Sequence, residues 1–377
     1  MKICVDGLGV SKLSGTGCYS YTYGLLSKLL EIYPQPQYDL IWDSEFRIPE
    51  WEKHKNLIYQ DLKINRKEND YKNLEDYLKN SKTDVYFSPN NGLSIPQNKV
   101  CHTIMTVHDL LPVSQKDLVD DKYYQKFMAL FPNAIQKSDK IIAVSHFIKH
   151  ELMAYYNVPD TKIEVIYPGI SPMFKPLNRD FATVSLKNRY SIGENFILYA
   201  GSIHPRKNLE VLIHVFDFLL KDMDDMQLVI VGSIDAKREE HYLTLKNLAE
   251  KLGIGNRVIF TGKVDYTDMP YFYNGARCFV NLSSYEGFPH TSVEASACNC
   301  PVVSLRNSSF SGVDIPHAFL LDTLDVNLLK NVIGNIMREK ETRNDLQKPF
   351  LGKKSKYSWD SVTNKMVHLI ESTVFPS

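Results

Sequence analysis

Short apolar segments alternate with longer segments of helical periodicity along this chain, and this alternation restricts the possible fold more than any other feature. Apolar runs bounded by turn residues are typical of buried strands in a parallel sheet that helices cover on both faces. The pattern therefore predicts an α/β fold with two successive series of strands. We expect these strands at Lys2–Asp6, Tyr38–Trp42, Val85–Ser88, Thr103–Val107, Lys140–Val144 and Ile163–Ile166, and then at Phe196–Ala200, Gln227–Val231, Val258–Thr261, Cys278–Leu282 and Pro301–Ser304.

The length and the break between the two series predict two domains. The chain has 377 residues, and one hydrophobic core stops growing at roughly 250–300 residues. A linker-like stretch after Pro168-Gly169 ends the first series. We expect two Rossmann-like domains, residues 1–173 and 174–356, whose parallel sheets face each other across a cleft. Residues 357–377 are expected to form an amphipathic helix, capped by Ser358 or Asp360, that returns to the N-terminal domain.

The composition excludes a broad class of partners. Lys and Arg total 44 and Asp and Glu total 44, so the net charge of zero lacks the positive surface that sequence-independent nucleic-acid binding requires. The six cysteines show no zinc-ligand spacing and are expected to be reduced thiols of a cytosolic protein. The first apolar segment is too short for a signal peptide, and no run approaches the ~20 apolar residues that span a bilayer. We expect a soluble cytoplasmic protein, or at most a peripheral one at the inner face of the membrane.

The most informative motif for function is a pair of glutamates, Glu286 and Glu294, eight positions apart. Glu286 lies in a Gly/Pro turn, and Glu294 lies inside the helix that is predicted to follow. A helix N-terminus after such a turn is an anion site, so the carboxylates could bind hydroxyls on either side of a phosphate. The residues expected around the phosphate and a sugar are Gly287, Phe288, Pro289, His290, Thr291 and Ser292. The alternative is an ordinary loop-to-helix junction with one capping and one solvated glutamate.

Two adjacent cations, Arg206 and Lys207, follow the predicted strand Phe196–Ala200 and precede a helix. Arginine binds phosphate through a bidentate fork and lysine acts as a point charge, so this turn could neutralise a diphosphate. It occupies the same position in its βα unit as the Glu286 turn does, so both could contact one ligand. A solvated basic turn is the alternative.

The N-terminal half offers two further candidates. Gly7-Leu8-Gly9 and then Ser14-Gly15-Thr16-Gly17 are expected to form a glycine-rich loop between a strand and a helix. This loop, with Gly15 and Gly17, could close over a phosphate or a sugar or be only a mobile surface loop. It is not a dinucleotide fingerprint. His108, at the end of strand Thr103–Val107, places an imidazole where the cleft should open, although a buried or capping histidine would fit the same position.

Two segments suggest other chemistry and are assigned mainly to ordinary structure. Asp222-Met223-Asp224 could bind a divalent metal, but it lies at the opposite end of the sheet from the expected site and fits a solvated acidic turn. The segment Lys122–Tyr156 mixes aromatic and basic residues and could rest on a membrane surface. Core packing explains most of its aromatic residues.

The motifs together resemble glycosyltransferase family 4, the retaining nucleotide-sugar enzymes of the GT-B fold. The resemblance covers nearly the whole chain, in order. It rests on Gly201–Asn208, the Glu286-to-Glu294 spacing, Ser145-His146-Phe147, Tyr167-Pro168-Gly169 and Tyr357-Ser358-Trp359.

The resemblance implies a role for each matched residue. Arg206 and Lys207 would hold the donor diphosphate, Glu294 the nucleotide ribose, and Glu286 the hydroxyls of the transferred sugar. His108 matches the histidine that the family places beside the reacting sugar. The backbone of residues 287–290 would help to hold sugar and phosphates, and residues 15–17 match the loop facing the diphosphate.

Details of the motifs imply a subgroup and a reaction. Pro289 stands where many members have glycine, which removes one N–H donor from the sugar site. The strings His108-Asp109-Leu110 and Asn307-Ser308-Ser309 are most similar to bacterial mannosyltransferases and rhamnosyltransferases of surface polysaccharides, which implies GDP-mannose as the donor. The reaction would move a hexose, with retention and without a metal or another cofactor, to a glycan or lipid-linked acceptor.

Two other function classes use the same residues differently. A glycoside hydrolase could use Glu286 and Glu294 as acid and nucleophile, and it would act without a nucleotide. The Arg206-Lys207 turn argues against it, because a hydrolase has no diphosphate to hold. A non-catalytic nucleotide-binding module would bind donor without turnover.

Overall fold

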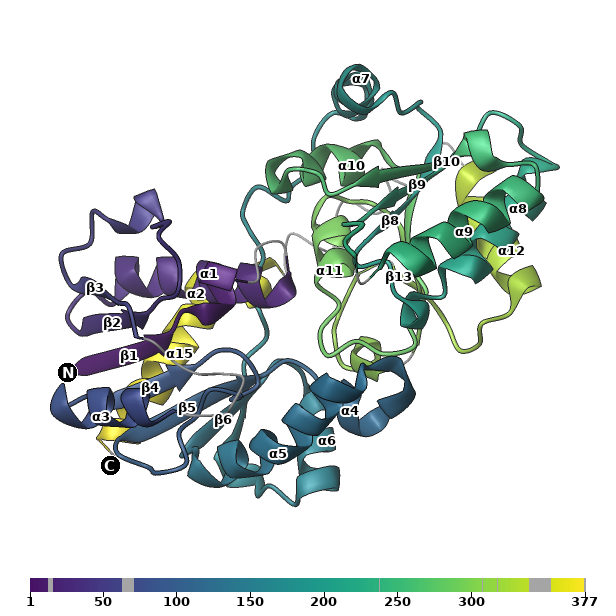
Figure 1. The fold of residues 1–377 in the computed structure, drawn as a ribbon. Coiled ribbons are helices and arrows are strands. Elements are labelled where there is room, and N and C mark those ends of the chain that lie inside the picture. Colours follow the sequence, from purple (N-terminus) through teal and green to yellow (C-terminus); the bar gives the residue numbers. More distant parts are fainter. Residues whose placement is uncertain are drawn as a thin grey trace. The chain divides into compact units, whose positions relative to one another are not determined.

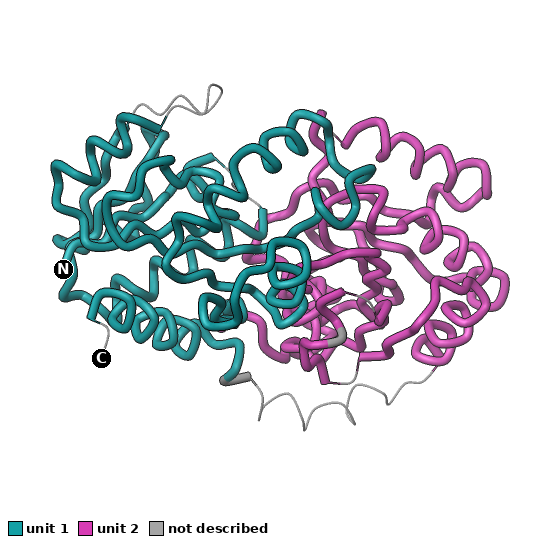
Figure 2. Tube along the Cα trace, turned by 90° about the horizontal axis from the view of Figure 1, so that it is seen from below, with its two compact units in different colours: residues 1–171, 355–377 teal, residues 172–354 magenta. Residues whose placement is uncertain are grey.

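The computed structural model divides the chain into two α/β units, residues Met1–Ser171 with Ser355–Ser377, and Pro172–Lys354 (Figure 2). We call them unit 1 and unit 2. The sequence predicted that the chain passes from one domain to the other near residues 173 and 356. The described residues are 1–12, 16–62, 71–236, 238–306, 308–316, 318–338 and 354–375.

Unit 1 contains a parallel sheet in which seven described strands have the order β3-β2-β1-β4-β5-β6-β7 (Figure 1). The strands are β1 (Lys2–Asp6), β2 (Gln37–Ile41), β3 (Leu57–Gln60), β4 (Val85–Ser88), β5 (His102–Val107), β6 (Lys140–Ala143) and β7 (Ile163–Val165). The described helices are α1 (Leu8–Lys12), α2 (Gly17–Ile32), α3 (Lys72–Asn80), α4 (Leu111–Ser114), α5 (Asp121–Lys137), α6 (His146–Tyr156) and α15 (Trp359–Val374).

Helix α15 returns to unit 1, as the sequence predicts. Ser358 caps it by accepting a hydrogen bond from the Ser361 N–H at 3.2 Å. Its apolar face, including Met366 and Ile370, joins α2 in the core that covers β1 and β2. The Trp359 indole lies so close to Gly24 and Gly169 that a Cβ on either glycine would approach it to 2.3 Å. Only glycine allows this contact at either position.

Unit 2 contains a second parallel sheet, in which the described strands have the order β10-β9-β8-β11-β12-β13. Its strands are β8 (Phe196–Ala200), β9 (Gln227–Val231), β10 (Val258–Gly262), β11 (Cys278–Asn281), β12 (Val302–Leu305) and β13 (Ala318–Leu321). The described helices are α7 (Arg179–Tyr190), α8 (Leu209–Leu220), α9 (Glu239–Lys251), α10 (Met269–Gly275), α11 (His290–Ala297) and α12 (Val326–Arg338).

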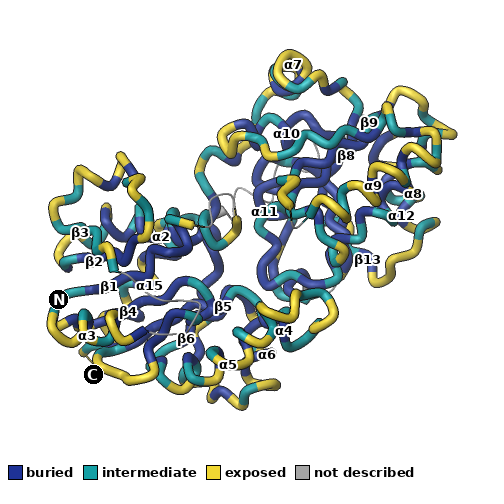
Figure 3. Tube along the Cα trace, viewed as in Figure 1, coloured by how far each residue is buried: buried dark blue, intermediate teal, exposed yellow. Residues whose placement is uncertain are grey.

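Strands β8, β9, β11 and β12 of unit 2 are largely buried (Figure 3). Alternate residues of β8, such as Ile197 and Tyr199, pack with α8, α9 and α12. The opposite face is covered by α10 and α11, where Tyr273 of α10 contacts Phe279 of β11 edge to face. Such two-sided burial explains why these strands are continuous apolar runs in the sequence.

The strand order creates a topological switch point in each sheet. In unit 2 the chain passes from β8 to β9 and β10 on one side, and then places β11 on the other side of β8. The loops after β8 and β11 therefore leave in opposite directions, and the crevice between them is where ligands bind in open α/β sheets. Those loops carry residues 201–208 and 282–290. In unit 1 the corresponding strands are β1 and β4.

Three elements differ from the sequence prediction. The segment Gly7-Leu8-Gly9, expected as a loop, belongs partly to α1, because the Asp6 carboxylate accepts a hydrogen bond from the Leu8 N–H at 3.0 Å and starts the helix. Strands β3 and β13 were not predicted. Both lie at sheet edges and are only partly buried, so their sequences lack the continuous apolar run of the central strands.

The aromatic segment of α5 and α6 packs mainly into the core of unit 1. Phe127 and Phe131 are fully buried and stack at 4.5 Å, with Tyr156 edge-on to Phe131 at 5.1 Å. Met153 and Tyr155 are exposed. Among the residues that the structure describes, no helix combines the length and the apolar character needed to cross a bilayer.

Candidate functional site

The turn after β8 presents two cations at the switch point of unit 2. His204 caps the short 3-10 helix η4 (Pro205–Lys207) by accepting a hydrogen bond from the Arg206 N–H at its Nδ1. Burial, with the neighbouring cations, lowers the pKa of His204 to about 4, so the ring is neutral and can accept this bond. Asn208 follows in the left-handed conformation and donates its amide to the Leu282 carbonyl at 2.7 Å. The turn is thereby fixed to the end of β11.

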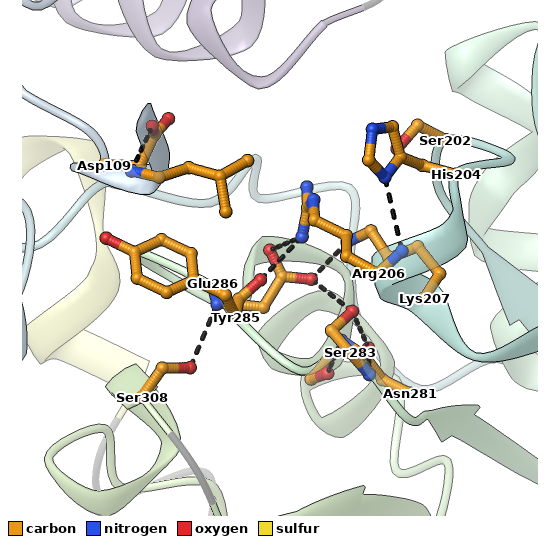
Figure 4. A network of polar contacts seen from close by, with 12 residues as sticks. Asp109, Ser202, His204, Arg206, Lys207, Asn281, Ser283, Tyr285, Glu286 and Ser308 are labelled. Carbon is orange, nitrogen blue, oxygen red and sulfur yellow. Dashed lines mark hydrogen bonds and ion pairs between the residues drawn. The ribbon is translucent and has the colours of Figure 1, made fainter. Parts of the chain in front are cut away.

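Both cations contact Glu286, which follows β11 (Figure 4). The Lys207 ammonium pairs with Glu286 Oε1, and the Arg206 guanidinium lies 3.3 Å from Oε2. Arg206 also donates to the Tyr285 carbonyl at 2.6 Å, and its own carbonyl accepts from the Ser284 N–H at 2.8 Å. The structure thus brings together two of the motifs that the sequence singled out, although they lie about 80 residues apart.

Burial and ion pairing control the protonation of this cluster. Burial alone would raise the pKa of Glu286, but the charges of Lys207 and Arg206 and the Ser283 hydroxyl lower it to about 2. Burial lowers the pKa of Lys207 to about 8, with Glu286 opposing the shift and Arg206 adding to it. At neutral pH the two cations and one carboxylate are all charged, which leaves an excess of positive charge in a largely buried site.

Helix α11 begins next to this cluster. Pro289 is the N-cap and not a residue of the first turn, and that turn contains no acidic residue. A positive helix end therefore adds to the charge of the two cations.

Ser292, which the sequence analysis expects around the phosphate and the sugar, lies inside α11. This side chain is fully buried, and its Oγ accepts a hydrogen bond from the Asn281 amide at 3.3 Å. The hydroxyl therefore fixes α11 to β11 and is not offered at the helix entrance. Thr291, one position earlier, is partly exposed.

A serine after β12 also holds the Glu286 loop. The Glu286 N–H donates to Ser308 Oγ at 2.9 Å, and the Ser309 N–H donates to the Glu286 carbonyl at 3.3 Å. The sequence drew attention to this string only for its resemblance to a subgroup. Its contact with Glu286 could not be predicted, because it joins the ends of two different strands. Asn307 lies outside the described residues.

Glu294 occupies an aromatic pocket that the sequence did not indicate. One carboxylate oxygen accepts the Tyr266 phenol and the other accepts the Tyr273 phenol, each at 2.9 Å. Phe174 contacts both tyrosine rings edge to face. Burial raises the pKa of Glu294 to about 7, although the two phenol hydrogen bonds oppose the shift. Glu294 as a whole residue is 6% exposed and lies four residues after His290, on the same face of α11.

In unit 1, His108 follows β5 and is held by the segment that follows β4. Its Nε2 lies 2.7 Å from the Pro89 carbonyl, and its N–H donates to Asn91 Oδ1 at 2.7 Å. A carbonyl only accepts, so Nε2 carries the hydrogen and Nδ1 is a bare acceptor in the neutral ring. Burial lowers the pKa of His108 below its usual value, although Pro89 and Asp109 oppose the shift.

The remaining expected residues are placed as follows. Gly17 is the first residue of α2, which Thr16 caps through the Tyr19 N–H. Gly15 lies outside the described residues. Asp222 forms ion pairs with Lys330 and Arg338 of α12, as an acidic surface turn would. Within the described ranges, no group of three or more His, Cys, Asp or Glu side chains is arranged to hold a metal ion.

Known proteins match both units. The model for glycosyl transferases group 1 matches residues 185–349, and the model for glycosyltransferase family 4 matches residues 58–174. Serotype-specific mannosyltransferase WbdA of Escherichia coli is 26% identical over 272 residues, which are 71% of this chain and 33% of that protein. O-antigen chain mannosyltransferase B of Escherichia coli is 24% identical over 296 residues, 77% of this chain and 75% of that protein. The match thus spans about a third of the length of WbdA.

A solved structure shares the fold over the whole chain. Alr3699/HepE from Anabaena, in complex with UDP and glucose, has a TM-score of 0.78 at 15% identity, and the match covers 99% of this chain and 100% of that one. The two family models, together with the two parallel-sheet units, define the protein as a glycosyltransferase of the GT-B fold. The chain belongs to glycosyltransferase family 4, with a group 1 domain in its C-terminal half.

Proposed function

We propose that the protein is a retaining hexosyltransferase that moves mannose from GDP-mannose to a hydroxyl of a glycan or lipid-linked acceptor, in the synthesis of a surface polysaccharide. The sugar and the pathway are supported by two relatives, one named a serotype-specific mannosyltransferase and the other an O-antigen chain mannosyltransferase. A nucleotide-sugar donor is supported by the Anabaena protein of the same fold, which was crystallised with UDP and glucose.

The single observation that carries the proposal is the cluster of Arg206, Lys207 and Glu286 at the switch point of unit 2. Two cations face one carboxylate beside the positive end of α11, so the site has a net positive charge that can bind a diphosphate. When a donor binds, its phosphate oxygens would share the guanidinium and the ammonium with Glu286. The Glu286 oxygens could then accept hydroxyls of the transferred sugar.

The proposed reaction replaces one C–O bond of the anomeric carbon with another and transfers one proton. The bond between the anomeric carbon and the β-phosphate oxygen breaks, and the oxygen keeps the electron pair. The acceptor oxygen bonds to the anomeric carbon on the same face and passes its proton to the departing phosphate. Arg206, Lys207 and the α11 N-terminus stabilise the charge on the leaving group, which requires no metal in this proposal. Glu294 would bind the ribose, and the bare Nδ1 of His108 could accept a sugar hydroxyl.

The proposal is tested first by binding and then by transfer. A ligand that binds only the folded state raises the melting temperature. Because the proposed donor is GDP-mannose, we expect GDP to raise it more than UDP or ADP. With GDP-mannose and an acceptor, NMR of the product should show a retained anomeric configuration, and EDTA should leave the rate unchanged. Arg206→Ala should raise the donor KM. Unchanged transfer by this variant at low donor concentration would refute the diphosphate assignment.

One observation favours glycoside hydrolysis as a second candidate. Glu286 and Glu294 have pKa values of about 2 and about 7, and a split between two carboxylates is found in glycosidases. Against it, Glu286 is ion-paired with Lys207, and both oxygens of Glu294 already accept phenols. An aryl mannoside supplied without nucleotide distinguishes the two functions, because only the hydrolase would cleave it.

A further inference from the structure

Tyr266 is exposed although its polar end is bound to a buried group. The residue lies in the 3-10 helix η6 (Tyr266–Asp268), between β10 and α10, and 46% of its surface is accessible. Its phenol donates to Glu294, which is 6% exposed. The aromatic ring of Tyr266 therefore leaves apolar surface uncovered next to a carboxylate that could bind a ligand.

The backbone of η6 is anchored, so the ring has a fixed position. Asp268 is buried and ion-pairs with Arg189, and it also accepts the Tyr190 phenol at 2.6 Å. The ring of Tyr266 meets the buried ring of Phe174 at 5.4 Å and 77°. With its phenol held by Glu294, Tyr266 is restrained at three points while part of its ring stays open to solvent.

Glu294 can bind a ribose without displacing Tyr266. An ionised carboxylate has about four acceptor positions, and the two phenols use one on each oxygen. The remaining positions can accept the ribose hydroxyls. In a nucleotide the base is attached to the ribose carbon next to the 2′-hydroxyl, so a ribose bound by Glu294 places its base beside this carboxylate. Of the two tyrosines there, Tyr273 is fully buried and only Tyr266 has accessible ring surface.

We propose that the ring of Tyr266 is the stacking platform for the base of the bound nucleoside diphosphate. This inference rests on the proposed function, because it takes Glu294 as the ribose ligand. Every nucleobase has a π face, so stacking adds affinity for any base and more for a purine, which has the larger ring system. The platform would strengthen nucleotide binding, while the choice among bases would come from other contacts.

The test separates the ring of Tyr266 from its hydroxyl. Tyr266→Phe keeps the ring and removes the bond to Glu294, whereas Tyr266→Leu removes both. Calorimetric titration with GDP, UDP and pyrophosphate should show GDP binding about tenfold or more weaker in Tyr266→Leu than in Tyr266→Phe. The loss should be smaller for UDP, and both variants should bind pyrophosphate like the wild type. Tyr266→Met, which can still fill space against Phe174, serves if the leucine variant does not fold.

Tyr271→Leu is the matched control. Tyr271 lies on α10, contacts Phe181 and Arg189, and is partly exposed, so it should leave GDP affinity within twofold of the wild type. Equal GDP affinities for Tyr266→Leu and Tyr266→Phe would overturn the stacking proposal alone, and so would an equal loss of pyrophosphate binding. If the wild type bound no nucleoside diphosphate, the proposed function would fail together with this inference.

Discussion

At the scale of single residues, Lys207 predicts how donor use depends on pH. Burial lowers its pKa to about 8 in the free protein, so the ammonium is charged below this pH and neutral above it. A neutral amine cannot attract a diphosphate. We expect kcat/KM for the donor, which reports groups of the free enzyme, to fall as the pH rises through about 8. In Lys207→Arg the guanidinium keeps its charge, and the decrease should move to higher pH. A decrease at the same pH in this variant would exclude Lys207 as its origin.

Glu294 predicts a second pH dependence of opposite direction. Its ionised form offers acceptors to a ribose, and with a pKa of about 7 it gains a proton as the pH falls. We therefore expect GDP affinity to weaken below about pH 7. Tyr273→Phe removes a hydrogen bond that favours the carboxylate, so the pKa should rise and this limb should move up by about one pH unit.

The dissociation constant of GDP is measured by calorimetry from about pH 5.5 to about pH 8.5. This interval brackets the pKa of Glu294, which is about 7. Glu294→Gln is the control, because an amide does not titrate there. This variant should bind GDP more weakly than the wild type at high pH, and its affinity should not decrease further as the pH is lowered. An acid limb that persists in Glu294→Gln would assign the effect to another group.

At the scale of elements, the sequence predicted the central strands and missed two of the four described edge strands. Strands β8 and β9 have the predicted bounds, because continuous apolar runs between turn residues have few other interpretations. Edge strands β3 and β13 carry mixed sequences and were missed. Helix α1 was missed because Gly9 disfavours a helix, whereas the Asp6 carboxylate accepts the Leu8 N–H at its start.

The connection after β12 predicts a positioning role for Ser308. Its hydroxyl accepts the Glu286 N–H, and its φ of 42° lies in the left-handed region that glycine adopts without strain. Ser308→Gly therefore removes the hydroxyl while keeping the backbone conformation. We expect kcat/KM for the donor to fall about tenfold, since loss of this part-buried hydrogen bond costs about 1–3 kcal/mol and frees the Glu286 loop.

Ser309→Ala is a matched control for that prediction. The Ser309 hydroxyl is buried and has no hydrogen-bond partner within the described part of the chain. Its removal should leave transfer within twofold of the wild type. Donor kinetics measured side by side decide the point, because an equal loss in both variants would show that any change in this connection impairs the enzyme.

At the scale of the whole molecule, the chain pattern predicted two α/β units and the return of α15, while parts of the candidate site could not be predicted. Arg206, Lys207 and Glu286 were found because each motif follows a strand, and parallel strands place such ends on one edge. Tyr266 and Tyr273 were missed because their contact with Glu294 depends on the path from β10 to α10. No local pattern encodes such a path.

The stability of unit 1 and nucleotide binding by unit 2 can be measured separately in this protein. Arg206, Lys207 and Glu294, which the proposed function assigns to the nucleotide, lie in unit 2. The three tryptophans, Trp42, Trp51 and Trp359, lie in unit 1 and report its unfolding by fluorescence. Met366 of α15 is 1% exposed in the core of unit 1, so Met366→Ala should cost about 2–5 kcal/mol and lower the urea midpoint of tryptophan fluorescence. Under native conditions its GDP affinity should stay within twofold of the wild type. A tenfold weaker affinity in the folded variant would show that unit 1 contributes to nucleotide binding.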